Sequence, residues 1–385
     1  MEIKKKIWSI IEGNQAELII LKSTNEDKLD FEISFTNIGA SIVNFKIQNK
    51  NGELLDILYK KDNPEDYFFN EDKSYMGSIV GRVASLVSFG HFEIKEDEIN
   101  KEYKLSKNLF GVHHMHGGFF GLNRKIWNVT ECNISDKNEA NITFSIISKD
   151  NEEGYPGNLN ISVNYQVKIF SNEKKLEFSY RILTKPDKTT IINIINHAYW
   201  NLNGIFNSID EMEIKLNSKQ YIKINYFKFI IQTLISKLRI KKYFKLFPIE
   251  IKNCNENGLN FENPMKFKDI FKIFGDLDTN FLLENYDNYE KPAELKLTDL
   301  IYVGFLSSKK SGLKMELYTT EPSITIFSGN NMKSFNKKCK KHFGVCLETM
   351  KPPNAINIPQ FANWIKFKPN ENYLHYTKFI FTIEK

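Results

Sequence analysis

Two separate segments of the chain hold side chains that could exchange protons with a ligand. His197 lies among aromatic residues at the end of an apolar stretch, in Asn196-His197-Ala198-Tyr199-Trp200. Glu348 lies inside an otherwise apolar run, Val345-Cys346-Leu347-Glu348-Thr349, where burial would raise its pKa unless partners satisfy it. A carboxylate in a dry cavity suits general-base catalysis. The structural alternatives are a salt bridge for the glutamate and a backbone-bonded core imidazole for the histidine.

A third segment is rich in histidine and glycine. His113, His114 and His116 lie within four positions and are followed by Gly117 and Gly118. On a strand, residues two apart share a face, so His114 and His116 could bind a metal together. No downstream Glu or His completes a recognised metal spacing, and we therefore expect no metal. The paired glycines indicate a backbone that lies close to a ligand or to a neighbouring strand.

The elements that must position these side chains are predicted to be β-strands. Apolar and polar residues alternate over 159–169 and again over 176–182, which is typical of half-buried strands. Similar short runs occur at 141–148, 190–195, 212–216, 313–319 and 323–327. Many strands with few helical periods predict a mainly β fold, a large antiparallel β-sandwich. Without a Pro- or Ser-rich linker, residues 1–385 are expected to form one domain.

One stretch departs from the strand pattern. Residues 226–256 form a predicted insertion, whose part from Tyr226 to Ile251 is rich in Phe, Ile, Lys and Leu. This part could be a basic amphipathic helix for a membrane surface or an acidic partner. We favour a surface insertion that packs its apolar side on the sheet, and its apolar core is too short to span a bilayer.

The composition narrows the class of protein. The net charge of +6, from 53 basic and 47 acidic residues, is spread along the chain, so a nucleic-acid partner is not expected. The basic start at Lys4-Lys5-Lys6 has no apolar region after it, which favours a cytoplasmic protein. The four cysteines have no metal-site spacing and are expected to be buried, reduced thiols.

Taken together, these segments resemble the aldose 1-epimerase (galactose mutarotase) family, and they occur in the family's order. Among them, Glu152-Glu153-Gly154-Tyr155-Pro156-Gly157-Asn158-Leu159 is the most distinctive. The other matching segments are Gly77 to Phe92 around Gly81-Arg82, His116-Gly117-Gly118 with Gly121 and Trp127, Asn196 to Leu202, Asp278 with Asn280-Phe281, Thr319-Thr320-Glu321-Pro322, Ser328-Gly329-Asn330 and Cys346-Leu347-Glu348-Thr349.

The resemblance implies a galactose mutarotase-like β-supersandwich with a sugar-binding cleft on one sheet. It implies His197 as general acid and Glu348 as general base in the exchange of α and β anomers of a free hexose such as glucose or galactose. His116, Asp278 and Arg82 are implied as sugar-binding groups. The chemistry needs no cofactor and no metal. We expect a small-molecule sugar as the partner, no membrane, and a monomer or homodimer.

The chain also departs from the family pattern at several sugar-binding positions. Ser85-Leu86 stands where the family has Asn-Arg, Thr325 and Met350 stand in place of glutamines, and Asn354 stands in place of an aspartate. These changes predict an epimerase of weaker affinity or altered sugar preference. They leave open a non-catalytic carbohydrate-binding or regulatory protein. A hexose-6-phosphate epimerase would need extra cationic groups for the phosphate, and the lost arginine argues against it.

Overall fold

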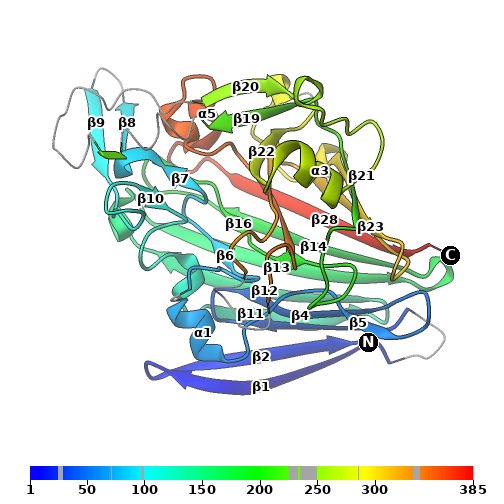
Figure 1. The fold of residues 1–385 in the computed structure, drawn as a ribbon. Helices are drawn as coiled ribbons and strands as arrows, with labels where there is room; N and C mark the ends of the chain where they lie inside the picture. The colour runs from blue at the N-terminus through cyan, green and yellow to red at the C-terminus, as the bar shows by residue number, and fades with distance from the viewer. Residues whose placement is uncertain are drawn as a thin grey trace.

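In this computed structural model, the long strands of one antiparallel sheet cross the middle of the molecule. Sheet β1–β5 lies on one side of them, with β19 and β20 at the opposite end (Figure 1). The structure describes residues 1–24, 29–70, 72–96, 99–224, 233–234, 249–284, 286–332 and 339–384. Most of the predicted insertion at 226–256, with its possible amphipathic helix, lies outside these residues. No helix within these ranges is both long and apolar enough to cross a membrane.

The central sheet has nine strands, all paired antiparallel. In spatial order they are β11 (Asn128–Asp136), β12 (Glu139–Ser148), β13 (Leu159–Phe170), β14 (Lys175–Thr184), β28 (Tyr373–Ile383), β24 (Leu313–Thr319), β23 (Ile301–Ser308), β18 (Glu213–Leu216) and β21 (Met265–Lys266). The strands predicted at 141–148, 159–169, 176–182, 212–216 and 313–319 are confirmed as members of this sheet. Along β13 every second residue is buried, as the alternation predicted.

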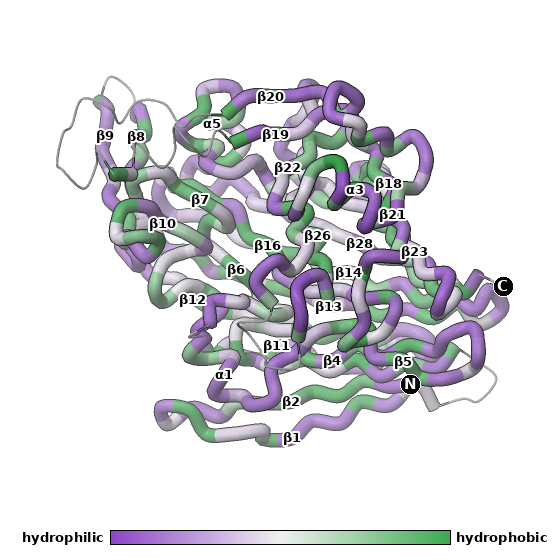
Figure 2. The backbone as a smooth tube through the Cα atoms, viewed as in Figure 1, coloured by the Kyte–Doolittle hydropathy of each residue, from purple (hydrophilic) through white to green (hydrophobic). Residues whose placement is uncertain are grey.

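Two further sheets complete the large antiparallel β-sandwich. One consists of β1 (Glu2–Ile11), β2 (Asn14–Lys22), β3 (Phe31–Thr36), β4 (Ser41–Gln48) and β5 (Leu54–Asp56). The other runs in the order β17 (Tyr199–Trp200), β26 (Val345–Met350), β25 (Ser323–Phe327), β22 (Asp278–Leu282), β19 (Gln220–Ile224) and β20 (Ile249–Asn253). The outer strand β20, at the described end of the insertion, is mostly hydrophilic (Figure 2).

Short elements connect the sheets. Two-stranded pairs are β6 (Ile79–Val80) with β16 (Ile195–Asn196), β7 (Leu86–Val87) with β10 (His114–Met115), β8 (His91–Glu96) with β9 (Ile99–Lys104), and β15 (Thr190–Ile191) with β27 (Lys366–Phe367). The α-helices that lie fully within the described ranges are α1 (Pro64–Phe69), α3 (Phe267–Phe274) and α5 (Ala362–Ile365). The 3-10 turns within these ranges are η1 (Ser88–Gly90), η2 (Leu122–Arg124), η3 (Glu152–Gly154), η4 (Ser171–Glu173), η6 (Asn255–Asn257), η7 (Tyr286–Asn288), η8 (Leu297–Asp299) and η9 (Ala355–Asn357).

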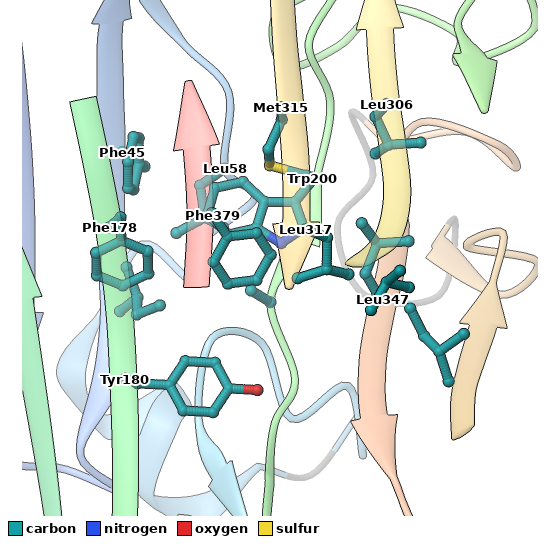
Figure 3. Close-up of a cluster of buried hydrophobic side chains, with 14 of the residues drawn as sticks. Phe45, Leu58, Phe178, Tyr180, Trp200, Leu306, Met315, Leu317, Leu347 and Phe379 are labelled. Atoms are coloured by element: carbon teal, nitrogen blue, oxygen red, sulfur yellow. The ribbon is translucent and has the colours of Figure 1, made fainter. Parts of the chain in front are cut away.

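Aromatic side chains join the three sheets in one core. The Phe45 ring of β4 lies 5.4 Å from Phe178 of the central sheet and 5.3 Å from Trp200 of β17, measured between ring centroids. Trp200 in turn lies 5.3 Å from Phe379 of β28 (Figure 3). Leu347 of β26 belongs to the same cluster (Figure 3). Because neighbouring strand residues face opposite ways, Glu348 must then face away from this core.

A buried ion pair holds the end of β26. Lys351 Nζ lies 2.8 Å from Glu321 Oε1, and both side chains are almost fully excluded from solvent. The Lys351 ammonium also lies 4.6 Å from the centre of the Tyr373 ring. Glu321 precedes β25 and Lys351 follows β26, so the pair ties together the ends of two neighbouring strands.

We predict that Lys351→Met destabilises the protein by about 3–5 kcal/mol, because it leaves the Glu321 carboxylate buried without its cation. The measurement is the free energy of unfolding from urea denaturation. The matched control is the double variant Lys351→Met/Glu321→Leu, which removes both charges and should recover most of the loss. A single variant as stable as the wild type would contradict this role for the pair.

Candidate active site

A cavity of about 920 Å³ opens on the face of the β17–β20 sheet that points away from the core. This volume is within the usual range for small-molecule sites. Its walls come from segments distant in sequence, including Tyr75, Leu86 of β7 and His116 after β10. Of the residues predicted from the sequence, His116, His197, Asp278 and Glu348 line this one cavity.

Strand register explains why polar groups gather on the cavity floor. Residues paired across antiparallel strands share a face of the sheet. One row across the floor is Asn280 of β22, Thr325 of β25 and Glu348 of β26. The adjacent row places Asp278 opposite Phe327 and Phe327 opposite Cys346, which in turn pairs with Tyr199.

The backbone of His197 is fixed to the segment that precedes β6. Its N–H donates to the Ser78 carbonyl at 3.0 Å, and its carbonyl accepts from the Gly77 N–H at 2.9 Å. The ring then lies between two side chains of β26. Nε2 is 3.4 Å from Glu348 Oε1, and Nδ1 is 3.6 Å from Cys346 Sγ.

Burial moves the pKa values of this pair in opposite directions. It lowers the pKa of His197 to about 4. It raises the pKa of Glu348 well above its usual value, and the neighbouring charge of Asp278 adds to that shift. Over a wide range of pH the two groups therefore hold one proton between them. A pair with one proton can give a proton at one point of a ligand and take one at another.

His116 presents a hydrogen-bond donor to the cavity. Its Nδ1 accepts from the Ser85 N–H at 3.2 Å, and burial holds the pKa of the imidazole well below its usual value. A neutral ring with an occupied acceptor at Nδ1 carries its proton on Nε2. The ring centre lies 4.7 Å from that of Tyr75 and 5.5 Å from that of His197.

The glycines after His116 have the role expected of them. Gly117 has a φ of 83°, and a Cβ there would lie 1.8 Å from the Gly81 carbonyl oxygen. Only glycine permits this approach of two backbones. The predicted contact between this backbone and a neighbouring segment is confirmed.

Asp278 stands at the start of β22 with its side chain exposed to the cavity. Surrounding protein atoms raise the pKa of its carboxyl group. Within the described ranges, no side chain or backbone group forms a hydrogen bond with this carboxyl. It is therefore available to a ligand hydroxyl.

Arg82 is the predicted site residue that the structure does not bring to the cavity. Its guanidinium is buried and donates all of its N–H groups to a different part of the chain. Nε donates to Ser148 Oγ, one terminal nitrogen to the carbonyls of Pro156 and Gly157, and the other to those of Ser148 and Lys149. With no donor left, Arg82 braces the β12–β13 connection and cannot also hold a sugar; its prediction as a ligand is corrected.

The histidine cluster divides between different tasks. His114 bonds through Nε2 to the Tyr155 hydroxyl at 2.6 Å and through Nδ1 to the Ser106 carbonyl at 2.7 Å. His113 Nε2 lies 2.8 Å from Thr233 Oγ1. In the part of the chain that the structure describes, no potential metal-ligand group contains any of His113, His114 and His116.

Two residues at the site, one lining the cavity and one buried beside it, were missed by the sequence analysis. Cys346 was expected only as a buried thiol, yet it contacts His197. Asn280 lies two residues after Asp278 and donates from Nδ2 to Ser323 Oγ and Thr325 Oγ1. In both cases the spacing of two from a candidate residue on a strand was the available signal.

The departures from the family pattern lie in the same cavity. Ser85, Leu86 and Thr325 all line it, so the altered positions face the ligand space. Thr325 Oγ1 donates to Met350 Sδ at 3.1 Å, so two of the changed residues contact each other.

Comparisons with known proteins agree with this architecture. Residues 23–379 match the family described as aldose 1-epimerase. The chain is 29% identical to a galactose mutarotase of Rattus norvegicus, covering 96% of this chain and 95% of that protein. It is 26% identical to an aldose 1-epimerase of Haemophilus influenzae, over 98% and 99% of the two chains. The solved galactose 1-epimerase of Lactobacillus acidophilus has the same fold, with a TM-score of 0.75 at 20% identity over 100% and 99% of the chains. The chain belongs to the aldose 1-epimerase family.

Proposed function

We propose that this protein is an isomerase that interconverts the α and β anomers of a free hexose. One observation carries the proposal: His197 Nε2 and Glu348 Oε1 lie 3.4 Å apart, buried, on the wall of a cavity large enough for a sugar. Several relatives are known as galactose mutarotases, which favours galactose as a substrate.

The proposed reaction moves two protons in opposite directions. The Glu348 carboxylate takes the proton of the anomeric hydroxyl while the His197 imidazolium gives a proton to the ring oxygen. The bond between the anomeric carbon and the ring oxygen breaks, and an open-chain aldehyde forms. After rotation of the carbonyl group, closure with the roles reversed gives the other anomer. Protons alone balance this reaction, so it requires neither a cofactor nor a metal.

Burial of the two side chains favours the open-chain state of the reaction. When the ring is open, Glu348 carries the proton and His197 is neutral, so neither group is charged. Desolvation penalises the ion pair that precedes opening and not this neutral state. The same burial that raises the pKa of Glu348 and lowers that of His197 therefore assists ring opening.

We infer that His116, Asp278 and Asn280 orient the sugar. The Nε2–H of His116 is a donor suited to the ring oxygen, and the carboxyl of Asp278 is an acceptor for a hydroxyl. Ser323 and Thr325 donate their hydroxyl protons to Met350, so each hydroxyl can only accept a hydrogen bond from the Asn280 amide. The Asn280 amide donates to both hydroxyls, and its orientation is therefore fixed. Fixed groups of this kind hold the reacting atoms in place.

Three further inferences accompany this function. We infer that residues 1–385 act as one domain, since one hydrophobic cluster includes residues from Ile19 to Phe381. The cytoplasmic location and the monomeric or homodimeric state stay predictions.

We predict that Glu348→Gln and His197→Asn each reduce catalysed mutarotation roughly a hundred- to ten-thousand-fold, because each removes one proton-transfer group. The measurement is polarimetry on freshly dissolved α-D-galactose and α-D-glucose. Glu250→Gln, an exposed change on β20, is the matched control and should keep the wild-type rate. Sugar binding without any rate acceleration by the wild type would favour a non-catalytic binding protein instead.

We also predict an acid limit of activity near pH 4. As the pH falls through the pKa of His197, about 4, the ring gains a proton while Glu348 is already protonated, and no base remains. Below this pH, kcat/KM should fall about tenfold per unit, after subtraction of the spontaneous rate. If kcat/KM instead falls around pH 6.5, the ordinary pKa of an imidazole, burial does not determine the pKa of His197.

The altered cavity wall gives a third prediction. Leu86→Arg restores a charged donor to a position that lines the cavity. Because a hydrogen bond from a charged group contributes about 1.5–3 kcal/mol, KM for galactose should fall roughly ten- to a hundredfold with kcat little changed. Leu86→Met controls for side-chain size. An unchanged or higher KM in Leu86→Arg would show that this position does not reach the sugar.

A further inference from the structure

His197 and Glu348, which line the cavity, form a group of a second chemical kind with the fully buried Cys346 beside them. A ring nitrogen of His197, Cys346 Sγ and a carboxylate oxygen of Glu348 all lie within 4.8 Å of one another, and all three residues are buried. Cys346 and Glu348 are two apart on β26, so they share its cavity face. Tyr199, two residues after His197, pairs with Cys346. The sheet register therefore produces this juxtaposition.

Thiolate, imidazole and carboxylate are the ligand types that Zn²⁺ binds in proteins. With the usual bond lengths, ligand atoms around a tetrahedral Zn²⁺ lie roughly 3.4–3.6 Å apart. Here the nitrogen and oxygen are 3.4 Å apart, and the nitrogen and sulfur are 3.6 Å apart. These two distances are measured from different nitrogens of His197. To bind one ion, the three side chains must move closer by about 1 Å, so that a single nitrogen lies at ligand distance from both the oxygen and the sulfur.

We propose that His197, Cys346 and Glu348 form a binding site for a thiophilic divalent cation of the Zn²⁺ class, and that this ion and the sugar exclude each other. Three protein ligands leave a fourth position for water, which can face the cavity because His197 and Glu348 line it. Among the described residues, no positively charged side chain lies between the three ligand atoms.

The charge of a neighbouring residue supports this assignment. Burial is the main cause that raises the pKa of Glu348 and Cys346, and the carboxylate of Asp278 adds to both shifts, so its negative field acts on this point and attracts a cation. Binding then replaces two protons, one from the thiol and one from the Glu348 carboxyl, with one Zn²⁺. The affinity should therefore increase with pH.

The ion would act as an inhibitor. It occupies both groups that exchange protons with the sugar, so no acid or base remains. This consequence rests on the proposed function, whereas binding of the ion does not. A chelator should restore the activity.

The direct test is equilibrium dialysis of the full-length protein against Zn²⁺, together with Co²⁺ absorption, in which a thiolate ligand produces a sulfur-to-metal charge-transfer band. We expect one ion per chain at this site, with the charge-transfer band present. Cys346→Ala and His197→Asn should each weaken binding at least about tenfold, and Cys346→Ala should abolish the band. Circular dichroism identifies any variant that fails to fold, and Cys346→Ser then replaces Cys346→Ala.

Two matched controls separate this site from others. Cys132→Ala removes the half-buried thiol of β11, and Glu102→Gln alters a surface group formed by His91, Glu93 and Glu102. Both variants should keep the ion and the band. Zinc binding that survives Cys346→Ala but is lost in Cys132→Ala or Glu102→Gln would overturn the proposal.

The activity measurement distinguishes the two proposals. Zn²⁺ should inhibit the wild type competitively with galactose, and Cys346→Ala, compared with its own metal-free rate, should need at least about tenfold more Zn²⁺. Binding in a protein without mutarotase activity would refute the proposed function and leave the metal site standing. Activity unaffected by saturating Zn²⁺ would overturn the mutual exclusion.

Discussion

The structure depends on one contact, the approach of His197 to Glu348 inside the protein. Removing an imidazolium and a carboxylate from water carries a penalty of several kcal/mol per ion, so two such groups would not stay buried and fully charged without strong compensation. A single shared proton avoids most of this penalty. In the proposed mechanism this shared proton is the one that moves when the hemiacetal opens, so the arrangement that lets the pair tolerate burial also supplies the proton transfer.

β26 has to satisfy two different surroundings at once. Glu348 lines the cavity and Cys346 lies on the same face of the strand, whereas Leu347 packs in the core. Thr349, on the core side, bonds to His375 and Thr377, both on β28 of the central sheet. Beyond the strand, Lys351 bonds to Glu321. Hydrogen bonds and an ion pair on one face thus fix the strand whose other face carries the reactive carboxylate, which limits the positional freedom of Glu348.

Sequence reasoning succeeded where local patterns carry the information and failed where long-range contacts decide. Alternation along 159–169 and 313–319 depends only on the period of a strand, and those strands are confirmed. The resemblance named His197 and Glu348, and the sheet places them together. The prediction for Arg82 was wrong because its partners are backbone carbonyls of the β12–β13 connection, and residue types do not reveal backbone acceptors. Cys346 was missed because a lone cysteine shows nothing until its neighbour across the sheet is known.

The changed residues at the cavity edge bear on affinity more than on rate. Leu86 and Thr325 line the space around the sugar, yet neither exchanges a proton with it. Groups that contact substrate and transition state alike change KM, and only groups whose interaction strengthens in the transition state change kcat. In the proposed mechanism, His197 and Glu348 belong to the second kind, because the charge that they carry changes during ring opening. A chain that lacks these peripheral donors but retains this pair has the groups that the proposed mechanism uses, and we expect the shape and polarity of the altered wall to set its sugar preference.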